Sequence, residues 1–168
     1  ELYVYDPDTG TTTAVLSADK NSSGSTSPWH PHALDGKLYF SGDDGSDDEL
    51  YVYDPDTGAT TAVASADKNS GGSTAPYDMH ALDGKLYFGG KDDSEKWELY
   101  VYDPVAGTTT AVASADKNGS GSTSPAYMHA LDGKLYFSGT DGLESELSAY
   151  DPDTRTTTAV ASADQHAA

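Results

Sequence analysis

The sequence of 168 residues contains no cysteine, few basic residues and no long apolar run. Without cysteine there is no disulfide framework and no thiolate metal site, although the redox compartment stays undecided. No stretch approaches the ~20 apolar residues of a membrane-spanning helix, and no secretory signal is visible. An apolar spacing near 3.6 residues is also absent, so we expect essentially no helix.

Charge is strongly one-sided, because 28 acidic side chains face only nine basic ones and give a formal net charge of −19. We therefore expect neither nucleic acid nor an anionic membrane surface as a partner, since binding to phosphate requires a positively charged surface. An acidic surface keeps a protein soluble and suits a salty or calcium-containing medium, where counterions screen the repulsion.

What the chain does contain is one unit of sequence in four copies. The block Glu-Leu-Tyr-Val-Tyr-Asp-Pro, altered in the last copy, recurs with periods of 48, 49 and 48 residues and begins at Glu1, Glu49, Glu98 and Glu146. A second block, His-Ala-Leu-Asp-Gly-Lys-Leu-Tyr-Phe, begins at His32, His80 and His129. Fixed periods in this range are typical of propellers, solenoids and arrays.

Each unit is predicted to hold four short antiparallel strands. Residues 1–5 alternate with period two, a Pro- and Gly-containing turn follows, and 11–17 is the return strand. After a polar crossing loop at 18–28, the strand at 29–34 enters an Asp-Gly hairpin, whose partner is 37–41. In the last copy Arg155 replaces the turn glycine, which should cost stability if that position is left-handed.

We therefore predict an all-β fold of β-propeller-type blades, with a half blade at 1–17 and full blades at 29–65, 77–114 and 126–162. One sheet cannot bury both of its faces, so neighbouring units must stack on it. Radial stacking gives a β-propeller, which we favour over a linear or superhelical stack. Propellers have four to eight blades, so three and a half units should not close. A homo-oligomeric ring, a piece of a longer array and a growing filament remain as explanations.

The block order resembles the kelch class of propeller repeats, in which a small-residue pair ends the second strand and a Tyr-Asp-Pro hairpin joins the third and fourth. Gly89-Gly90 matches the kelch diglycine, whereas the kelch tryptophan is absent. The units resemble still more closely the secreted bacterial propeller repeats with an E-L-W-x-x-D-G-T signature. Tyr3, Tyr51 and Tyr100 stand where that tryptophan would be. This resemblance implies a propeller at an extracellular or cell-surface location.

Two groups of residues are candidate metal ligands. The histidines that open the second block could form a ring around an axis, but we favour a hydrogen bond of each imidazole within its own blade, because a propeller radius holds equivalent residues apart. The acidic turn with Asp43, Asp47 and Asp48 offers the oxygen ligands that calcium prefers. Solvated turns are the alternative. We expect no cofactor, with calcium as the one metal candidate.

A third group suits a sugar, since polar groups beside an aromatic platform are typical of lectins. The polar members are Asp19, Asn21, Asp67, Asn69, Asp116 and Asn118, from three Asp-Lys-Asn triplets, and the aromatic members are Trp29, Tyr77 and Tyr127. Ordinary turns and packing aromatics are the alternative.

No nucleophile, base and acid stand out as a catalytic set, and near-identical repeats favour multivalent binding or assembly over one asymmetric site. We expect a chain that is not an enzyme, a scaffold for extracellular structure, adhesion or self-assembly that binds copies of itself. The alternative is a lectin-like, multivalent propeller that binds glycans.

Overall fold

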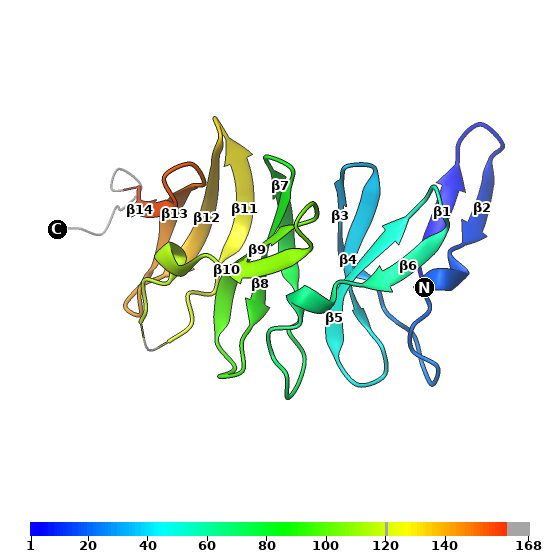
Figure 1. Cartoon of the computed structure of the whole chain (residues 1–168), viewed down its shortest axis with the longest axis horizontal. Helices are drawn as coiled ribbons and strands as arrows, with labels where there is room; N and C mark the ends of the chain where they lie inside the picture. The colour runs from blue at the N-terminus through cyan, green and yellow to red at the C-terminus, as the bar shows by residue number, and fades with distance from the viewer. Residues whose placement is uncertain (120, 161–168) are drawn as a thin grey trace.

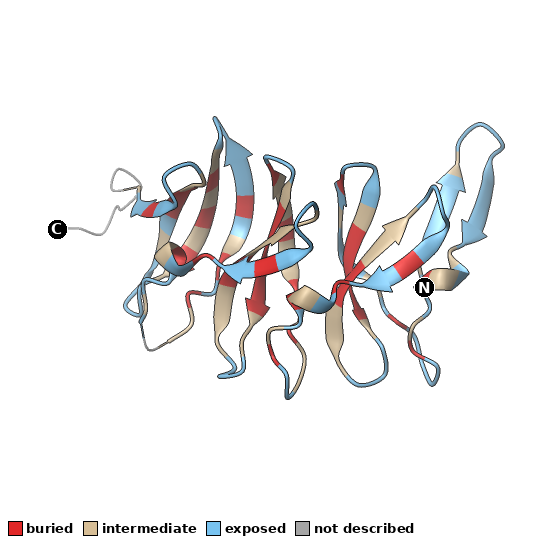
Figure 2. Ribbon diagram, viewed as in Figure 1, coloured by how far each residue is buried: buried red, intermediate tan, exposed pale blue. Residues whose placement is uncertain are grey.

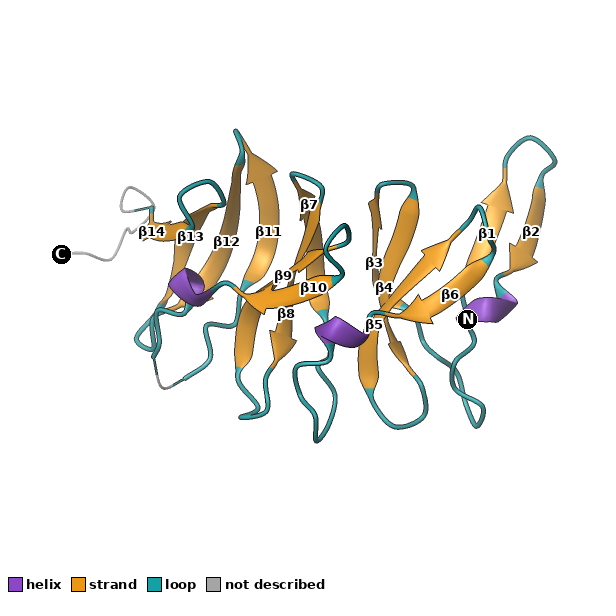
Figure 3. Ribbon diagram, viewed as in Figure 1, coloured by secondary structure: helices purple, strands orange, loops and turns teal. Residues whose placement is uncertain are grey.

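The computed structural model describes residues 1–119 and 121–160, and its regular structure consists of β-strands and three short 3₁₀ turns, joined by loops (Figures 1 and 3). Each sheet is an antiparallel meander in chain order. The half blade pairs β1 (Tyr3–Asp6) with β2 (Thr11–Ala14). Blade 1 holds β3 (Trp29–Leu34), β4 (Lys37–Asp43), β5 (Asp48–Asp54) and β6 (Ala59–Ala62). Blade 2 holds β7 (Tyr77–Leu82), β8 (Lys85–Lys91), β9 (Trp97–Asp103) and β10 (Thr108–Ala111). Blade 3 holds β11 (Ala126–Leu131), β12 (Lys134–Thr140), β13 (Ser145–Asp151) and β14 (Thr156–Ala159). The predicted all-β class with four-stranded antiparallel blades is confirmed.

The hairpins form where the sequence supplies turn residues. In the turn between β5 and β6, the Asp54 carboxylate accepts the backbone N–H of Asp56 at 3.0 Å, and Gly58 takes a φ of +68°. The residue at the corresponding place in blade 3 is Arg155, and it also adopts a left-handed φ of +57°. The turn position is therefore left-handed in blade 3 as well. We expect Arg155 to cost stability there, because an L side chain is strained in this conformation.

Three short 3₁₀ turns depart from the expectation of no helix, and they shorten the predicted return strand. The strand expected over 11–17 ends at Ala14, and the turns follow the last strand of a unit, at Leu16–Ala18, Ala64–Ala66 and Ala113–Ala115. In the first, the backbone N–H of Ala18 donates to the carbonyl of Val15 at 2.9 Å, and Ala18 is buried. No α-helix occurs at residues 1–119 or 121–160, and no described helix is long and apolar enough to cross a membrane.

A bulge interrupts the pairing of the innermost strand in every full blade. In blade 3 the register shifts between Ala126 and His129, and Tyr127 adopts a φ of +56°. Tyr77 pairs directly with Gly89, and the residue that pairs in the same way in blade 3 is Ala126. Tyr127 therefore lies one residue after the position that Trp29 and Tyr77 occupy in their blades. Our grouping of these three aromatic residues as equivalent is wrong.

The blades lie side by side in a curved row, from the half blade (blue) to blade 3 (yellow to red), with the innermost strands β3, β7 and β11 adjacent (Figure 1). An apolar cluster fills each junction. Leu34 and Leu50 of blade 1 pack with Met79, Phe88 and others of blade 2, and a matching cluster joins blades 2 and 3. A smaller cluster with Phe40 joins the half blade to blade 1. The buried surface thus lies between sheets (Figure 2).

Candidate functional site at the blade junctions

A repeated pair of polar contacts crosses each junction at its outer edge. In the junction of blades 1 and 2, the Ser65 hydroxyl lies 3.1 Å from that of Thr109, and the Lys68 ammonium donates to the Thr109 carbonyl at 2.9 Å. The same contacts join Ser17 and Lys20 to Thr60, and Ser114 and Lys117 to Thr157. The 3₁₀ turn places the serine, and the following triplet places the lysine, against the outermost strand of the next blade.

Tyrosines pack across the same junctions. The rings of Tyr39 and Tyr102 have centroids 5.9 Å apart, and Tyr87 and Tyr150 repeat this distance in the next junction. Burial, together with the neighbouring Tyr102 and Asp35, raises the pKa of Tyr39 to about 12. These phenols are therefore neutral near pH 7, and they supply apolar contact without adding to the large negative charge.

The histidines form a ladder through the blades, and our expectation for them is wrong. Their ring centroids lie 5.5 Å apart between His32 and His80 and 5.8 Å apart between His80 and His129, so the curve of the row brings equivalent residues together. The Nε2 of His80 accepts the backbone N–H of Ala130 in the next blade at 3.0 Å, rather than bonding within its own blade. Partial burial lowers the pKa of His80, which favours the neutral ring that can accept this bond.

The two ends of the row expose side chains whose counterparts are buried at the junctions. On blade 3, Leu147 is 39% exposed, whereas its counterparts Leu50 and Leu99 are 0% and 1% exposed. On the half blade, Tyr3 is 57% exposed, whereas its counterpart Tyr51 is 4% exposed. Pale blue marks this exposure on β1 and β2 (Figure 2). In the part of the chain that the structure describes, each end of the row therefore exposes a side chain of the kind that a junction buries.

The predicted sugar-binding aromatics do not make equivalent platforms. Trp29 is exposed, and Tyr127 is exposed on the bulge. Tyr77 is half-buried, because its ring packs edge-on against Trp97 at 5.0 Å and fills the space above Gly89. The aromatic residue of each copy thus has a different environment.

The amides of the Asp-Lys-Asn triplets are engaged inside the chain. Asn21 is buried and donates to the Asp43 carboxylate at 3.2 Å. Asn69 is also buried and donates to Glu95 at 2.6 Å, and Asn118 donates to the Ser122 carbonyl at 3.1 Å. The carboxylates of the triplets, Asp19, Asp67 and Asp116, are on exposed residues. The structure gives the asparagines a role in closing the crossing loop.

The acidic turn of blade 1 is organised by its own hydrogen bonds. Asp43 accepts the backbone N–H of Gly45 at 2.6 Å as well as the Asn21 amide. Burial, with the charges of Asp43 and Asp47, raises the pKa of Asp48. Within residues 1–119 and 121–160, no group of three or more His, Asp or Glu side chains is placed to hold a metal ion.

Sequence reasoning missed the junction contacts of the serines, lysines and histidines. The sequence did contain a signal for these residues, because each of them recurs in three copies at the period of the repeat unit. Periodicity alone does not reveal whether a recurring polar residue bonds within its blade or to the next one.

Comparison with solved structures identifies the class of fold as propeller-like. A puromycin-hydrolyzing peptidase of Mycobacterium tuberculosis superposes on 94% of this chain with a TM-score of 0.63 and 18% identity. TolB from Acinetobacter baumannii superposes on 94% with a TM-score of 0.61 and 17% identity. A puromycin hydrolase S511A variant complexed with PGG superposes on 79% with a TM-score of 0.59 and 18% identity. No family model and no curated protein matches the sequence.

The chain spans only 23%, 20% and 36% of the lengths of the peptidase, the hydrolase variant and TolB. At these identities the likeness shows the fold alone. It nevertheless corrects our expectation of a chain that is not an enzyme, because two of these structures are of puromycin-hydrolyzing enzymes. A propeller-like fold is therefore no argument that a chain is not an enzyme.

Proposed function

We propose that this chain is a self-assembling propeller segment, in which the end face of blade 3 packs on the half blade of a second copy. The support comes from the matched exposure of the two ends. Leu147 is partly exposed, whereas its counterpart Leu50 is buried at the junction of blades 1 and 2. Tyr3 is exposed, whereas its counterpart Tyr100 is buried at the same junction. Leu50 and Tyr100 belong to one apolar cluster, so the same pairing joins Leu147 to the Tyr3 of another copy.

This contact is heterologous, because two different surfaces meet. Heterologous contacts give a closed ring when the rotation closes and a filament when it does not. Two large apolar side chains at each contact bury enough surface to be worth roughly 3–6 kcal/mol before the cost of association. The charge of −19 on each copy opposes association, and added salt screens that repulsion.

The test uses two variants that each destroy one side of the contact. Leu147→Asp removes the blade 3 surface, and Tyr3→Asp removes the half-blade surface. We expect wild type to show a concentration-dependent mass in light scattering that increases with salt, and each variant alone to be a monomer. An equimolar mixture should form dimers and nothing larger, because one intact contact remains.

The matched control is Leu143→Asp, since Leu143 is 91% exposed on the β12–β13 turn and lies outside the clusters. This control should associate like wild type. A wild-type chain that stays monomeric at millimolar concentration and high salt would refute the proposal, as would a mixture that remains monomeric.

The lectin-like function is a weaker candidate. Trp29 is an exposed aromatic next to a polar loop, as a weak glycan site requires, but the triplet asparagines already have partners in the chain. A kelch-like or secreted bacterial repeat ancestry, with an extracellular or cell-surface location, fits the proposed assembly. Calcium at the acidic turn would be revealed by a calcium-dependent increase in melting temperature.

A further inference from the structure

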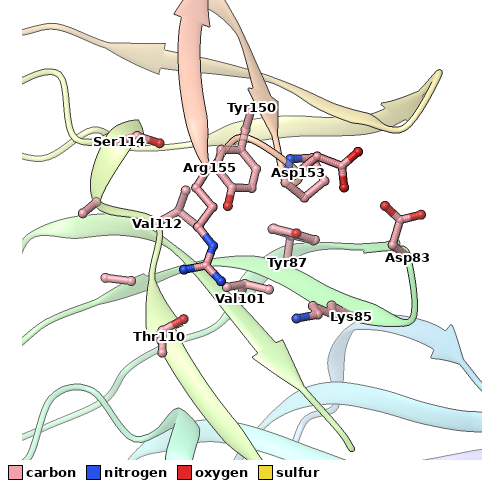
Figure 4. Close-up of a pocket in the computed structure, with 13 residues that line it drawn as sticks. Asp83, Lys85, Tyr87, Val101, Thr110, Val112, Ser114, Tyr150, Asp153 and Arg155 are labelled. Carbon is pink, nitrogen blue, oxygen red and sulfur yellow. The ribbon is translucent and has the colours of Figure 1, made fainter. Parts of the chain in front are cut away.

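A groove of about 630 Å³ opens between blades 2 and 3, beside the β13–β14 turn (Figure 4). Its inner wall is apolar and includes Val101, Val112 and the rings of Tyr87 and Tyr150. Four charged side chains also line the groove, and these are Asp83, Lys85, Asp153 and Arg155. The groove therefore combines an apolar surface with both signs of charge, as sites for small polar molecules do.

Arg155 is unusual in two respects. It is the only arginine of the chain. It also holds a φ of +57° at a turn position that glycine occupies in the other three copies, with φ between +66° and +68°. A strained backbone conformation at a residue other than glycine is a recurrent feature of functional sites.

The corresponding place between blades 1 and 2 provides an internal comparison. The residues that match Asp83, Lys85, Tyr87 and Tyr150 are Asp35, Lys37, Tyr39 and Tyr102. The aromatic pair there has the same 5.9 Å separation. Only the turn differs, since Val105 and Gly107 stand in place of Asp153 and Arg155. Asp153 and Arg155 thus add two charges to the junction of blades 2 and 3 that the junction of blades 1 and 2 lacks at these positions.

The charges are separated within the groove. Figure 4 shows the Arg155 guanidinium beside Val101 and Thr110 at one end, and the carboxylates of Asp83 and Asp153 toward the other. Lys85 is engaged by Asp103 at 3.0 Å, whereas no carboxylate among residues 1–119 and 121–160 forms an ion pair with Arg155. The guanidinium is thus the cation that can take a ligand carboxylate.

We propose that this groove binds a small zwitterion with an apolar body, such as an amino acid or a short peptide. Its carboxylate would be held by Arg155, its ammonium group by Asp83 and Asp153, and its side chain would lie against Val101 and Val112. A ligand carrying only negative charge fits less well, because the two carboxylates in the groove would repel it. The site does not depend on self-assembly, since its described lining comes from one chain.

The experiment is a titration followed by two-dimensional NMR, with phenylalanine, N-acetylphenylalanine and phenylalanine amide as probes. Phenylalanine should give saturable shifts at the amides of Val101 and Thr110. Each blocked probe should bind about tenfold more weakly, because it loses one charged hydrogen bond. Absence of saturable shifts with phenylalanine would overturn the proposal, as would equally tight binding of either blocked probe.

Arg155→Gly is the decisive variant, because it restores the residue of the other turns and relieves the left-handed strain, so the fold is retained. Phenylalanine affinity should decrease about tenfold. The reciprocal variant Val105→Asp/Gly107→Arg should create a second set of shifts around Tyr39, and a Cβ at Gly107 meets no atom within 4 Å. Unchanged affinity in Arg155→Gly, or no second site in the reciprocal variant, would refute the assignment.

Discussion

Leu34, Leu82 and Leu131 offer a controlled measurement of what a blade junction contributes to stability. They occupy the same place in three copies of one sequence block, yet their exposed fractions are 6%, 8% and 59%. Leu82 packs against Met128 and Leu135 of blade 3, whereas Leu131 lies on the open face of blade 3. Replacement of each by alanine removes the same atoms from different surroundings.

Leu82→Ala should lower the free energy of unfolding by about 2–5 kcal/mol, and Leu34→Ala should do the same, because each loses transfer energy and leaves a cavity. Leu131→Ala should cost about 1 kcal/mol or less, since most of its surface is already in water. Urea denaturation at micromolar protein concentration measures all three. A loss from Leu131→Ala as large as that from Leu82→Ala would refute the assignment of an open end face.

Three further perturbations test other contacts. Burial raises the pKa of Glu49 to about 7, so stability should fall as pH rises from 4.5 through 7. Glu49→Gln should therefore gain about 1–2 kcal/mol at pH 8, after allowance for partial exposure, and nothing at pH 4. Gly89→Ser should cost about 1–3 kcal/mol, because a Cβ there would lie 2.4 Å from the Tyr77 ring, and the added change Tyr77→Ala should recover part of the loss. The lowered pKa of His80 means that stability is full above about pH 6.5 and declines as pH falls through the folded pKa, and His80→Gln should flatten that decline in thermal melts.

The sequence was sufficient to predict the features that depend on contacts within one blade, namely its strands and hairpins. Alternation of side chains and Asp-Gly pairs place the strands and hairpins within a few residues, since both signals act between near neighbours. The left-handed turn position at Arg155 was also predictable, because three other copies have glycine there.

Contacts between blades were not predictable in the same way. The distance between His32 and His80 depends on how closely two sheets approach, and that distance results from side-chain packing across the whole junction. The offset of Tyr127 comes from a bulge, which adds a residue to one strand without a distinctive sequence signal. Each 3₁₀ turn contains one buried alanine, and the sequence does not show which alanine the folded junction buries.

The row of blades has a consequence for how the chain unfolds. Among residues 1–119 and 121–160, the apolar clusters join neighbouring blades, so the stability of the whole approximates a sum of blade terms and junction terms. Blade 2 has two complete junctions, whereas the half blade has one small cluster and a single pair of strands. Amide hydrogen exchange should therefore proceed from the ends inward, with β1 and β2 exchanging first and β8 last. Addition of a copy at either end would turn a fraying terminus into an interior blade.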